Sequence, residues 1–552
     1  MSASDGDSVG AVAADFWDWQ LRENPEMATA LGDYRFDARL TDLSADAFAR
    51  RGMEARALVR RLDAIGPQAG EDAITADVLR HHLAEPIDAD RLRLAEIAVD
   101  QMDGPQVAFP RLMSRHPLRD AGDLANLAAR YQTFPVQMEQ YISNLREGLA
   151  KRRAAPRVVV ERVLAQLRDC LAEEPSSSAF VQGRPAEFRT ELSIVTSQCV
   201  FPGYRALLEF LERDYLPRAR ADVGLWALPG GYEVYAFAIR QRAGTRQTPA
   251  DLHQLGVREL ERIEREVRAI VRQQDRRSLE QWKAADPRFA DREAMLAAYR
   301  GAVERFHGGL PAGFTCHPPV ALHVEAIPGY MERGAPSLHY EPPSGDGARP
   351  ALLLVNISQA EAQLRYPMEA QVAHEAAPGR HLMVSLAPGL SGLPAVRRAL
   401  VPGFSEGWAM YAERLADELG LYSDDRARLG MLLAQSWRAA RLVVDTGMHA
   451  LKWTREHAIE SLMEISVAAR SEAEAEVDRT IAWPAQGMAD AVGALELASA
   501  RSDAEKALGA RFSRQAFHDR LLASGPVPLQ TMRRSVLEWA LGPLNPEAAP
   551  GG

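Results

Sequence analysis

A histidine–glutamate pair with a second histidine close behind it is the feature of this 552-residue sequence that points most directly to chemistry. His374 and Glu375 are followed by Pro378 and Gly379, and then by His381. In zinc hydrolases such a pair lies on a helix, where the imidazole binds the metal and the adjacent carboxylate acts as general base toward water. In the usual H-E-x-x-H spacing the second histidine would stand where Pro378 stands here. Because Pro-Gly breaks a helix, a kink can return His381 to the same metal; the alternative is an exposed helix end with two incidental histidines.

A carboxylate about 30 residues further on supplies a third candidate ligand. Glu406 stands near the start of an expected helix, and with His374 and His381 it would form a three-ligand zinc shell that leaves a position for water. Tyr411 and Glu413 lie within two turns of Glu406 and are candidates to contact the ligands from behind. The alternative is that Glu406 only favours the positive end of its helix dipole.

A third group of polar residues is spaced to share one helical face. Arg441, Asp445 and His449 follow one another at intervals of four residues. Asp445 can hold the His449 ring in one tautomer while Arg441 keeps Asp445 ionised, and a histidine oriented in this way suits an oxyanion donor. A buried structural ion-pair network is the equally weighted alternative.

The composition excludes several classes of function. The chain has 65 Lys and Arg against 75 Asp and Glu, a net charge of −10, and no dense basic stretch, so a nucleic-acid partner is disfavoured. Its 3 cysteines are widely separated and form no disulfide or zinc framework, which fits a reducing compartment. No signal-peptide pattern and no membrane-spanning apolar run are visible. We therefore expect a cytoplasmic protein without a membrane partner, and the sequence does not indicate its oligomeric state.

Helical patterns dominate the chain. Thr248 and Pro249 are typical of a helix start, and apolar residues recur behind them at helical spacing. The residue composition changes between 311 and 370, where Pro, Gly and β-prone residues become frequent. This change predicts two or three short strands. Further helices are predicted at 16–31, 45–62, 124–149 and 158–171, and the strands at 321–327 and 351–357.

These patterns predict one cooperative, mainly α fold. We expect four parts: a helical N-terminal half at 1–310, strands and loops at 311–370, a helical half with the metal site at 371–541, and a tail at 542–552.

The sequence resembles the bacterial family called domain of unknown function 885. Its HEAAPGRHL and FSEGWAMYAERLADELGLY phrases belong to a set of nine that follow one another in the family's order. That family is similar to the gluzincin metallopeptidases, the group of angiotensin-converting enzyme and the thermolysin-like oligopeptidases. The nine phrases lie at 25–44, 145–160, 248–263, 324–331, 374–382, 404–422, 441–453, 476–486 and 506–529.

The resemblance implies two helical halves around a deep cleft, a small β-sheet at the edge of that cleft, one zinc ion, and hydrolysis of a small peptide or amide. In this scheme Glu375 is the general base, and His449 or Tyr411 holds the developing oxyanion. The expected metal ligands are His374, His381 and Glu406. Candidates to grip a substrate carboxylate or amide are Arg380, Arg479 and Gln486, the supporting residues are Arg441, Asp445 and Glu413, and the strand at 351–357 is a candidate to pair with an extended substrate.

The sequence also departs from the family pattern. Arg380 stands where the family most often has histidine directly after Pro-Gly, and Thr480, Ala485 and Asp490 replace a tyrosine, a glycine and a tyrosine. We expect His381 to take over as ligand in a specialised subgroup. The alternative is a repurposed relative whose metal site is weakened or lost, and which binds a small molecule without hydrolysing it.

Overall fold

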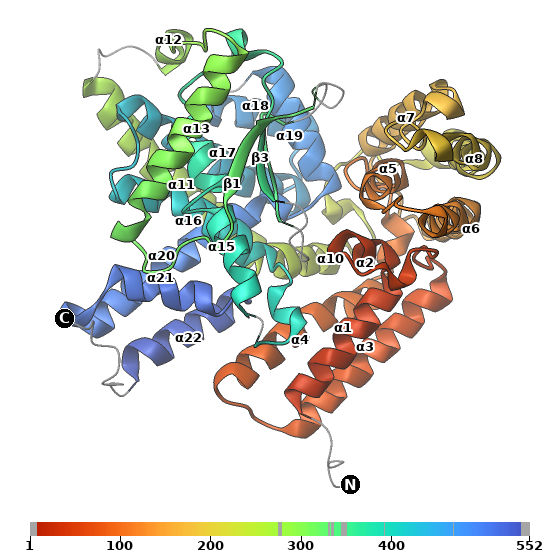
Figure 1. The fold of residues 1–552 in the computed structure, drawn as a ribbon, viewed down its shortest axis with the longest axis horizontal. Coiled ribbons are helices and arrows are strands. Elements are labelled where there is room, and N and C mark those ends of the chain that lie inside the picture. Colours follow the sequence, from red (N-terminus) through yellow and green to blue (C-terminus); the bar gives the residue numbers. More distant parts are fainter. Residues whose placement is uncertain are drawn as a thin grey trace. The chain divides into compact units, whose positions relative to one another are not determined.

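The computed structural model describes residues 8–273, 279–328, 332, 336–343, 350–390, 392–466 and 469–542. It confirms the predicted fold class, because helices dominate the described chain and the strands form one small sheet (Figure 1). The expected deep cleft stays a prediction. Most of the expected tail at 542–552 lies outside the described residues.

The helices begin where the local sequence predicts. Helix α11 (Pro249–Gln273) follows Thr248, whose Oγ1 accepts a hydrogen bond from the Asp251 N–H at 3.2 Å. The pattern at 16–31 is divided between two helices, because Pro25 begins a new helix after Asn24. These two are α1 (Val9–Glu23) and α2 (Pro25–Leu31), and the other predicted helices are α3 (Ala45–Ile65), α6 (Ala121–Ala150) and α7 (Arg157–Ala172).

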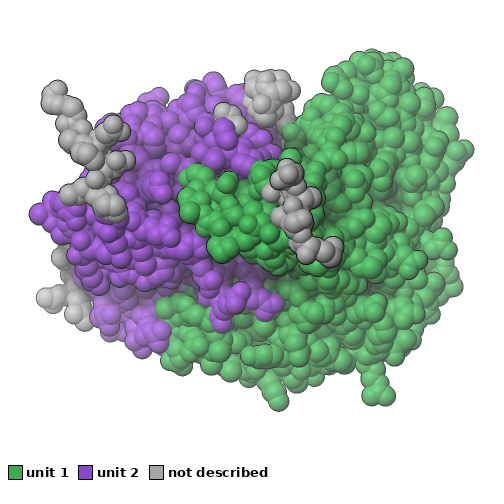
Figure 2. Space-filling view, turned by 90° about the horizontal axis from the view of Figure 1, so that it is seen from below, with its two compact units in different colours: residues 1–239, 247–255, 441–487 green, residues 240–246, 256–440, 488–552 purple. Residues whose placement is uncertain are grey.

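The chain divides into two compact units, coloured separately in Figure 2. Unit 1 consists of residues 1–239, 247–255 and 441–487, and unit 2 of residues 240–246, 256–440 and 488–552. One boundary falls within helix α11 and another within helix α17 (Asp425–His449), and each unit combines segments that are distant in the sequence. The four sequence-based parts stay a prediction.

Unit 1 is built from helices. Besides α1 to α3, α6 and α7, it contains α4 (Gly70–Arg91), α5 (Pro105–Arg115), α8 (Arg189–Val195), α9 (Phe201–Phe210), α10 (Gly231–Ala238), α18 (Arg455–Ser466) and α19 (Arg470–Ala482).

Unit 2 contains the sheet and the helices that carry the His-Glu segment. Its elements outside the sheet and the shared helices are α12 (Leu279–Ala284), α13 (Arg292–Gly309), α14 (Met368–Glu375), α15 (Arg380–Leu386), α16 (Pro402–Glu418), α20 (Ala489–Leu508), α21 (Arg514–Ala523) and α22 (Leu529–Leu541). A buried apolar cluster that includes Val372 and Ala373 of α14 also takes in residues of the sheet, α13 and α17. This cluster fixes the helix whose last residues are His374 and Glu375.

The sheet has the strand order β1-β3-β2. The predicted strands appear as β1 (Leu322–Ala326) and β3 (Ala351–Val355), and β2 (Leu338–Glu341) is the third. Strand β3 pairs in parallel with β1 and antiparallel with β2. Because β3 is central, both of its edges are occupied by neighbouring strands, and it has no free edge for the substrate pairing expected of it.

Among the residues that the structure describes, no helix is both long enough and apolar enough to cross a membrane.

Candidate metal centre

The break after the His-Glu pair has a clear structural cause. Helix α14 ends at Glu375, and α15 starts at Arg380, so Pro378 and Gly379 interrupt the helix as predicted. A Cβ atom at Gly379 would lie 2.1 Å from the His374 carbonyl oxygen, a distance that only glycine avoids. The chain therefore turns tightly at this point, and the residue that starts the next helix is Arg380.

Helix α16 is fastened to this break by a buried tryptophan. Trp408 is fully buried, and its Nε1–H donates to the carbonyl oxygens of Pro378 at 3.1 Å and Gly379 at 3.2 Å. Since Trp408 follows Glu406 by two residues, this contact sets the distance between Glu406 and the end of α14.

Glycines allow a further helix to approach α16. A Cβ atom at Gly407 would lie 2.4 Å from the Gly493 Cα, and one at Gly493 would lie 1.9 Å from the Gly403 carbonyl oxygen. The backbones of α16 and α20 are therefore in direct contact. Asp490 lies one turn before Gly493, so this contact carries its carboxylate toward Glu406.

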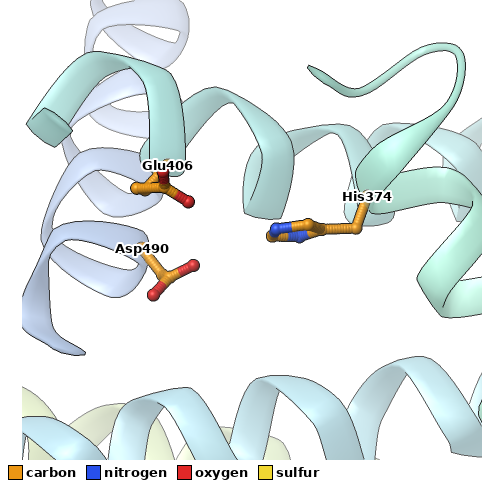
Figure 3. A group of neighbouring side chains, drawn as sticks. All are labelled: His374, Glu406 and Asp490. Carbon is orange, nitrogen blue, oxygen red and sulfur yellow. The ribbon is translucent and has the colours of Figure 1, made fainter. Parts of the chain in front are cut away.

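His374, Glu406 and Asp490 point toward one another (Figure 3). One nitrogen or carboxylate oxygen from each lies within 4.8 Å of the others. His374 and Asp490 are 6 % exposed, and Glu406 is half-buried. An imidazole and two carboxylates are a common ligand set for a divalent cation.

A buried carboxylate orients the His374 ring. Nδ1 of His374 lies 2.8 Å from Oε1 of Glu413, which is fully buried and also pairs with Arg438 at 2.9 Å. Nη2 of Arg438 also lies 3.1 Å from this Nδ1. Because the Glu413 carboxylate can only accept and is the nearer of the two groups, we assign the ring proton to Nδ1. Nε2 is then left as a lone pair, the form in which histidine binds metals.

Arg380 joins the general base to the second carboxylate. Its Nε–H donates to Glu375 Oε2 at 2.9 Å, while Nη1 and Nη2 donate to Glu406 Oε1 at 3.1 Å and Oε2 at 2.6 Å. Burial alone would raise the pKa of Glu406, but the charge and hydrogen bonds of Arg380 lower it below its usual value. Glu406 is therefore held as an anion, in a fixed orientation.

The structure does not bring His381 to His374 and Glu406. Its Nδ1 lies 3.1 Å from the Tyr340 hydroxyl and its Nε2 lies 3.0 Å from the Val320 carbonyl oxygen. Neighbouring residues of a helix point about 100° apart, so the direction that Arg380 takes toward the carboxylates is closed to His381.

Tyr411, expected near the metal, lies in a buried network within unit 2. Its hydroxyl contacts His518 Nε2 at 2.8 Å and accepts a hydrogen bond from Arg501 at 3.2 Å.

His449, the other oxyanion candidate, belongs to unit 1 and is bound by backbone groups. Leu225 N–H donates to its Nδ1 at 3.2 Å, and its Nε2–H donates to the Thr480 carbonyl at 3.1 Å.

Asp445, expected to orient His449, is bound by two other segments of unit 1, and its predicted role toward His449 stays a prediction. It accepts hydrogen bonds from the Tyr235 hydroxyl at 2.7 Å and from the Ala485 N–H at 2.8 Å. Ala485 has a φ of 64°, in the left-handed region that favours glycine, and the bond from Asp445 stabilises this turn.

Arg441, Arg479 and Gln486 are linked to one another within unit 1. Arg441 and Arg479 both pair with the buried Glu476, and Arg479 also donates to Gln486. Their charges lower the pKa of Glu476, although burial opposes this shift.

Two residues of the centre were not among the predicted site residues. Asp490 was noted only as a departure from the family pattern, although an acidic residue in the first turn of a helix is a visible signal. Arg438 stands one turn before Arg441 on the predicted helix, and nothing in the local sequence marks it as a partner of Glu413.

His381 and His518 are expected to make the protein less stable in mild acid. Burial lowers the pKa of each to about 4, whereas the unfolded chain takes up the proton near pH 6.5. The free energy of unfolding should therefore fall as the pH drops from about 6.5 to about 4, by up to about 3 kcal/mol per histidine. Urea unfolding at pH 7.5 and pH 4.5 measures the loss. His518→Gln should reduce it, and an equal loss in that variant would contradict the prediction.

Comparison with known proteins places the chain in a family. Residues 25–536 match the family described as "Bacterial protein of unknown function (DUF885)", and the chain belongs to it. No curated protein matches the chain.

Two solved structures share the fold. A protein from Colwellia psychrerythraea, provisionally described as a lipoprotein, is 26% identical with a TM-score of 0.89, over 96% of this chain and 98% of its own. A protein of unknown function from Shewanella oneidensis, described in the same provisional way, is 16% identical with a TM-score of 0.73, over 97% of this chain and 100% of its own.

Proposed function

We propose that this protein is a metal-dependent hydrolase of a small peptide or amide, with one divalent cation held by His374, Glu406 and Asp490. The observation that carries the proposal is the orientation of His374: Glu413 holds the Nδ1 proton, which leaves the Nε2 lone pair for a cation. Zinc bonds of about 2.0–2.2 Å need donors closer together than 4.8 Å, so binding requires small rotations of these side chains. Zinc is the expected ion, and a shell with two carboxylates also suits manganese.

A cation bound there would polarise the scissile carbonyl and make a water molecule more acidic. Glu375 lies directly after His374 and accepts a proton from the attacking water through Oε1, since its Oε2 is held by Arg380. The water oxygen bonds to the carbonyl carbon, the C–N bond breaks, and Glu375 passes the proton to the departing nitrogen. The products are a carboxylic acid and an amine.

Metal titration and two substitutions test this function. Protein stripped with a chelator should bind one equivalent of Zn²⁺ in calorimetry, and His374→Ala should abolish that binding. Glu375→Gln should keep the metal but lower hydrolysis of a dipeptide panel by about 10²–10⁴-fold. Glu418→Gln, an exposed position on α16, the helix of Glu406, should change neither. Failure to bind Zn²⁺ or Mn²⁺, or full activity in Glu375→Gln, would refute the proposal.

Arg380 favours a second candidate, a binding protein without hydrolytic activity. Its guanidinium contacts both oxygens of Glu406 and one of Glu375, so a cation of the protein itself already neutralises these carboxylates. Under this alternative the wild-type protein binds no metal, and Arg380→Ala gains metal affinity because the competing cation is removed. Under the first proposal, Arg380→Ala loosens Glu375 and Glu406 and lowers activity.

The cellular location is a separate question. The composition favours the cytoplasm, whereas the two related structures are described provisionally as lipoproteins, a class that is attached to membranes. Fractionation of the native cells, with detection of the full-length chain, separates these possibilities.

A further inference from the structure

Unit 2 contains two buried tyrosine–histidine pairs in which the direction of the hydrogen bond can be deduced. In the first, His381 Nε2 lies 3.0 Å from the Val320 carbonyl oxygen, which can only accept. Nε2 therefore carries the proton. Burial lowers the pKa of His381 to about 4, so the ring is neutral and Nδ1 is a bare lone pair. The Tyr340 hydroxyl, 3.1 Å away, must donate its proton to Nδ1.

The second pair follows the same logic. We call it closed because its tyrosine oxygen also accepts a hydrogen bond from another side chain, and we call a pair without such a donor open. His518 Nδ1 lies 2.9 Å from the Gly313 carbonyl oxygen, so its Nε2 accepts the Tyr411 proton at 2.8 Å. The Tyr411 oxygen then accepts a hydrogen bond from Arg501. Both functions of this hydroxyl are used, which is typical of a structural tyrosine.

The Tyr340 pair is open. Its proton is committed to His381, and among the residues that the structure describes no donor bonds to the Tyr340 oxygen. This oxygen can therefore accept a hydrogen bond but cannot supply one. A tyrosine in this state does not stabilise an oxyanion, because that role needs its proton.

Strand β2, which carries Tyr340, packs against α14, the helix that ends at the general base. The Gln371 side chain accepts from Tyr299 at 2.7 Å and donates to Ser337 at 3.2 Å, which links α14 to the start of β2. Gln371 and Glu375 are four residues apart and share one face of α14. The charge of Glu375 adds to the effect of burial in raising the pKa of Tyr340, which agrees with this placement.

We propose that Tyr340, oriented by His381, is a specificity residue that accepts a hydrogen bond from an N–H group of the substrate next to the scissile carbonyl. The inference rests on the proposed function and names its substrate class: amides that carry an N–H at the bond to be cleaved, rather than esters or N-alkylated amides. Tyr340 takes no proton and gives none to the reacting atoms, so its contribution is to binding and alignment.

Two dipeptides that differ only at the peptide nitrogen, which carries a hydrogen in one and a methyl group in the other, test this inference. Alanyl-alanine and its analogue methylated on the peptide nitrogen are titrated by calorimetry into metal-loaded Glu375→Gln protein. The N–H peptide should bind more tightly, and Tyr340→Phe should weaken it about 3- to 10-fold while leaving the methylated peptide unchanged. Tyr411→Phe, the matched closed pair, should lower thermal stability and keep the discrimination.

A second readout needs no substrate. Nitrogen-15 spectra of His381 should show the proton on Nε2, and Tyr340→Phe should shift the Nδ1 resonance alone. Discrimination that survives in Tyr340→Phe, no binding of either dipeptide, or a proton on Nδ1 would overturn the inference. If metal binding and the Glu375→Gln effect are normal while discrimination survives, this inference fails and the proposed function stands.

Discussion

Replacing Glu413 by alanine is expected to lower the free energy of unfolding by about 3–5 kcal/mol and metal affinity by about 10- to 100-fold. Glu413 is fully buried, and three side chains converge on it: His374, Arg438 and Gln435. Its removal leaves the Arg438 guanidinium without its closest carboxylate. It also frees the His374 ring to rotate, so Nε2 no longer faces Glu406 and Asp490. Urea unfolding and Zn²⁺ calorimetry measure the two effects.

Two comparisons identify the source of this loss. Glu418→Ala removes an exposed glutamate of the same helix, whose partner is Arg501, and should cost no more than about 1 kcal/mol. The double substitution Glu413→Leu with Arg438→Met removes the buried pair together and should recover much of the stability but none of the metal affinity. Equal stability of the double and single variants would show that the orphaned charge is not the cause.

The sequence predicts the parts of the centre that depend on local structure. The helix that carries His374, its end before Pro378 and the two strands at 321–327 and 351–357 all appear near their predicted positions. Each follows from hydrophobic periodicity, a Pro-Gly break or β-branched composition, and these act within a few residues.

The direction of side chains beyond the break did not follow from the sequence. Spacing allowed His381 to return to the metal, but α15 starts at Arg380, the residue before His381, and directs the Arg380 side chain to Glu375 and Glu406. A shift of one residue turns a helical side chain by about 100°. The local sequence does not determine the first residue of a helix when a tertiary contact holds the break before it. Here that contact is made by Trp408.

Gly493→Ala is expected to be among the most disruptive single changes in unit 2, with a loss of at least about 3 kcal/mol. The new Cβ would lie 1.9 Å from the Gly403 carbonyl oxygen and 2.6 Å from the Gly407 Cα. Both are backbone atoms of α16, so no side chain can rotate to relieve the overlap, and α16 and α20 must separate. Separation also carries Asp490 away from Glu406. Zn²⁺ affinity should therefore fall together with stability, since the two carboxylates come from these two helices.

Gly301→Ala is the matched control, because a Cβ there meets nothing within 4 Å and alanine favours an exposed helix by about 1 kcal/mol. A Gly493→Ala protein as stable as the wild type, with unchanged Zn²⁺ affinity, would show that contact between the two helices does not build the centre.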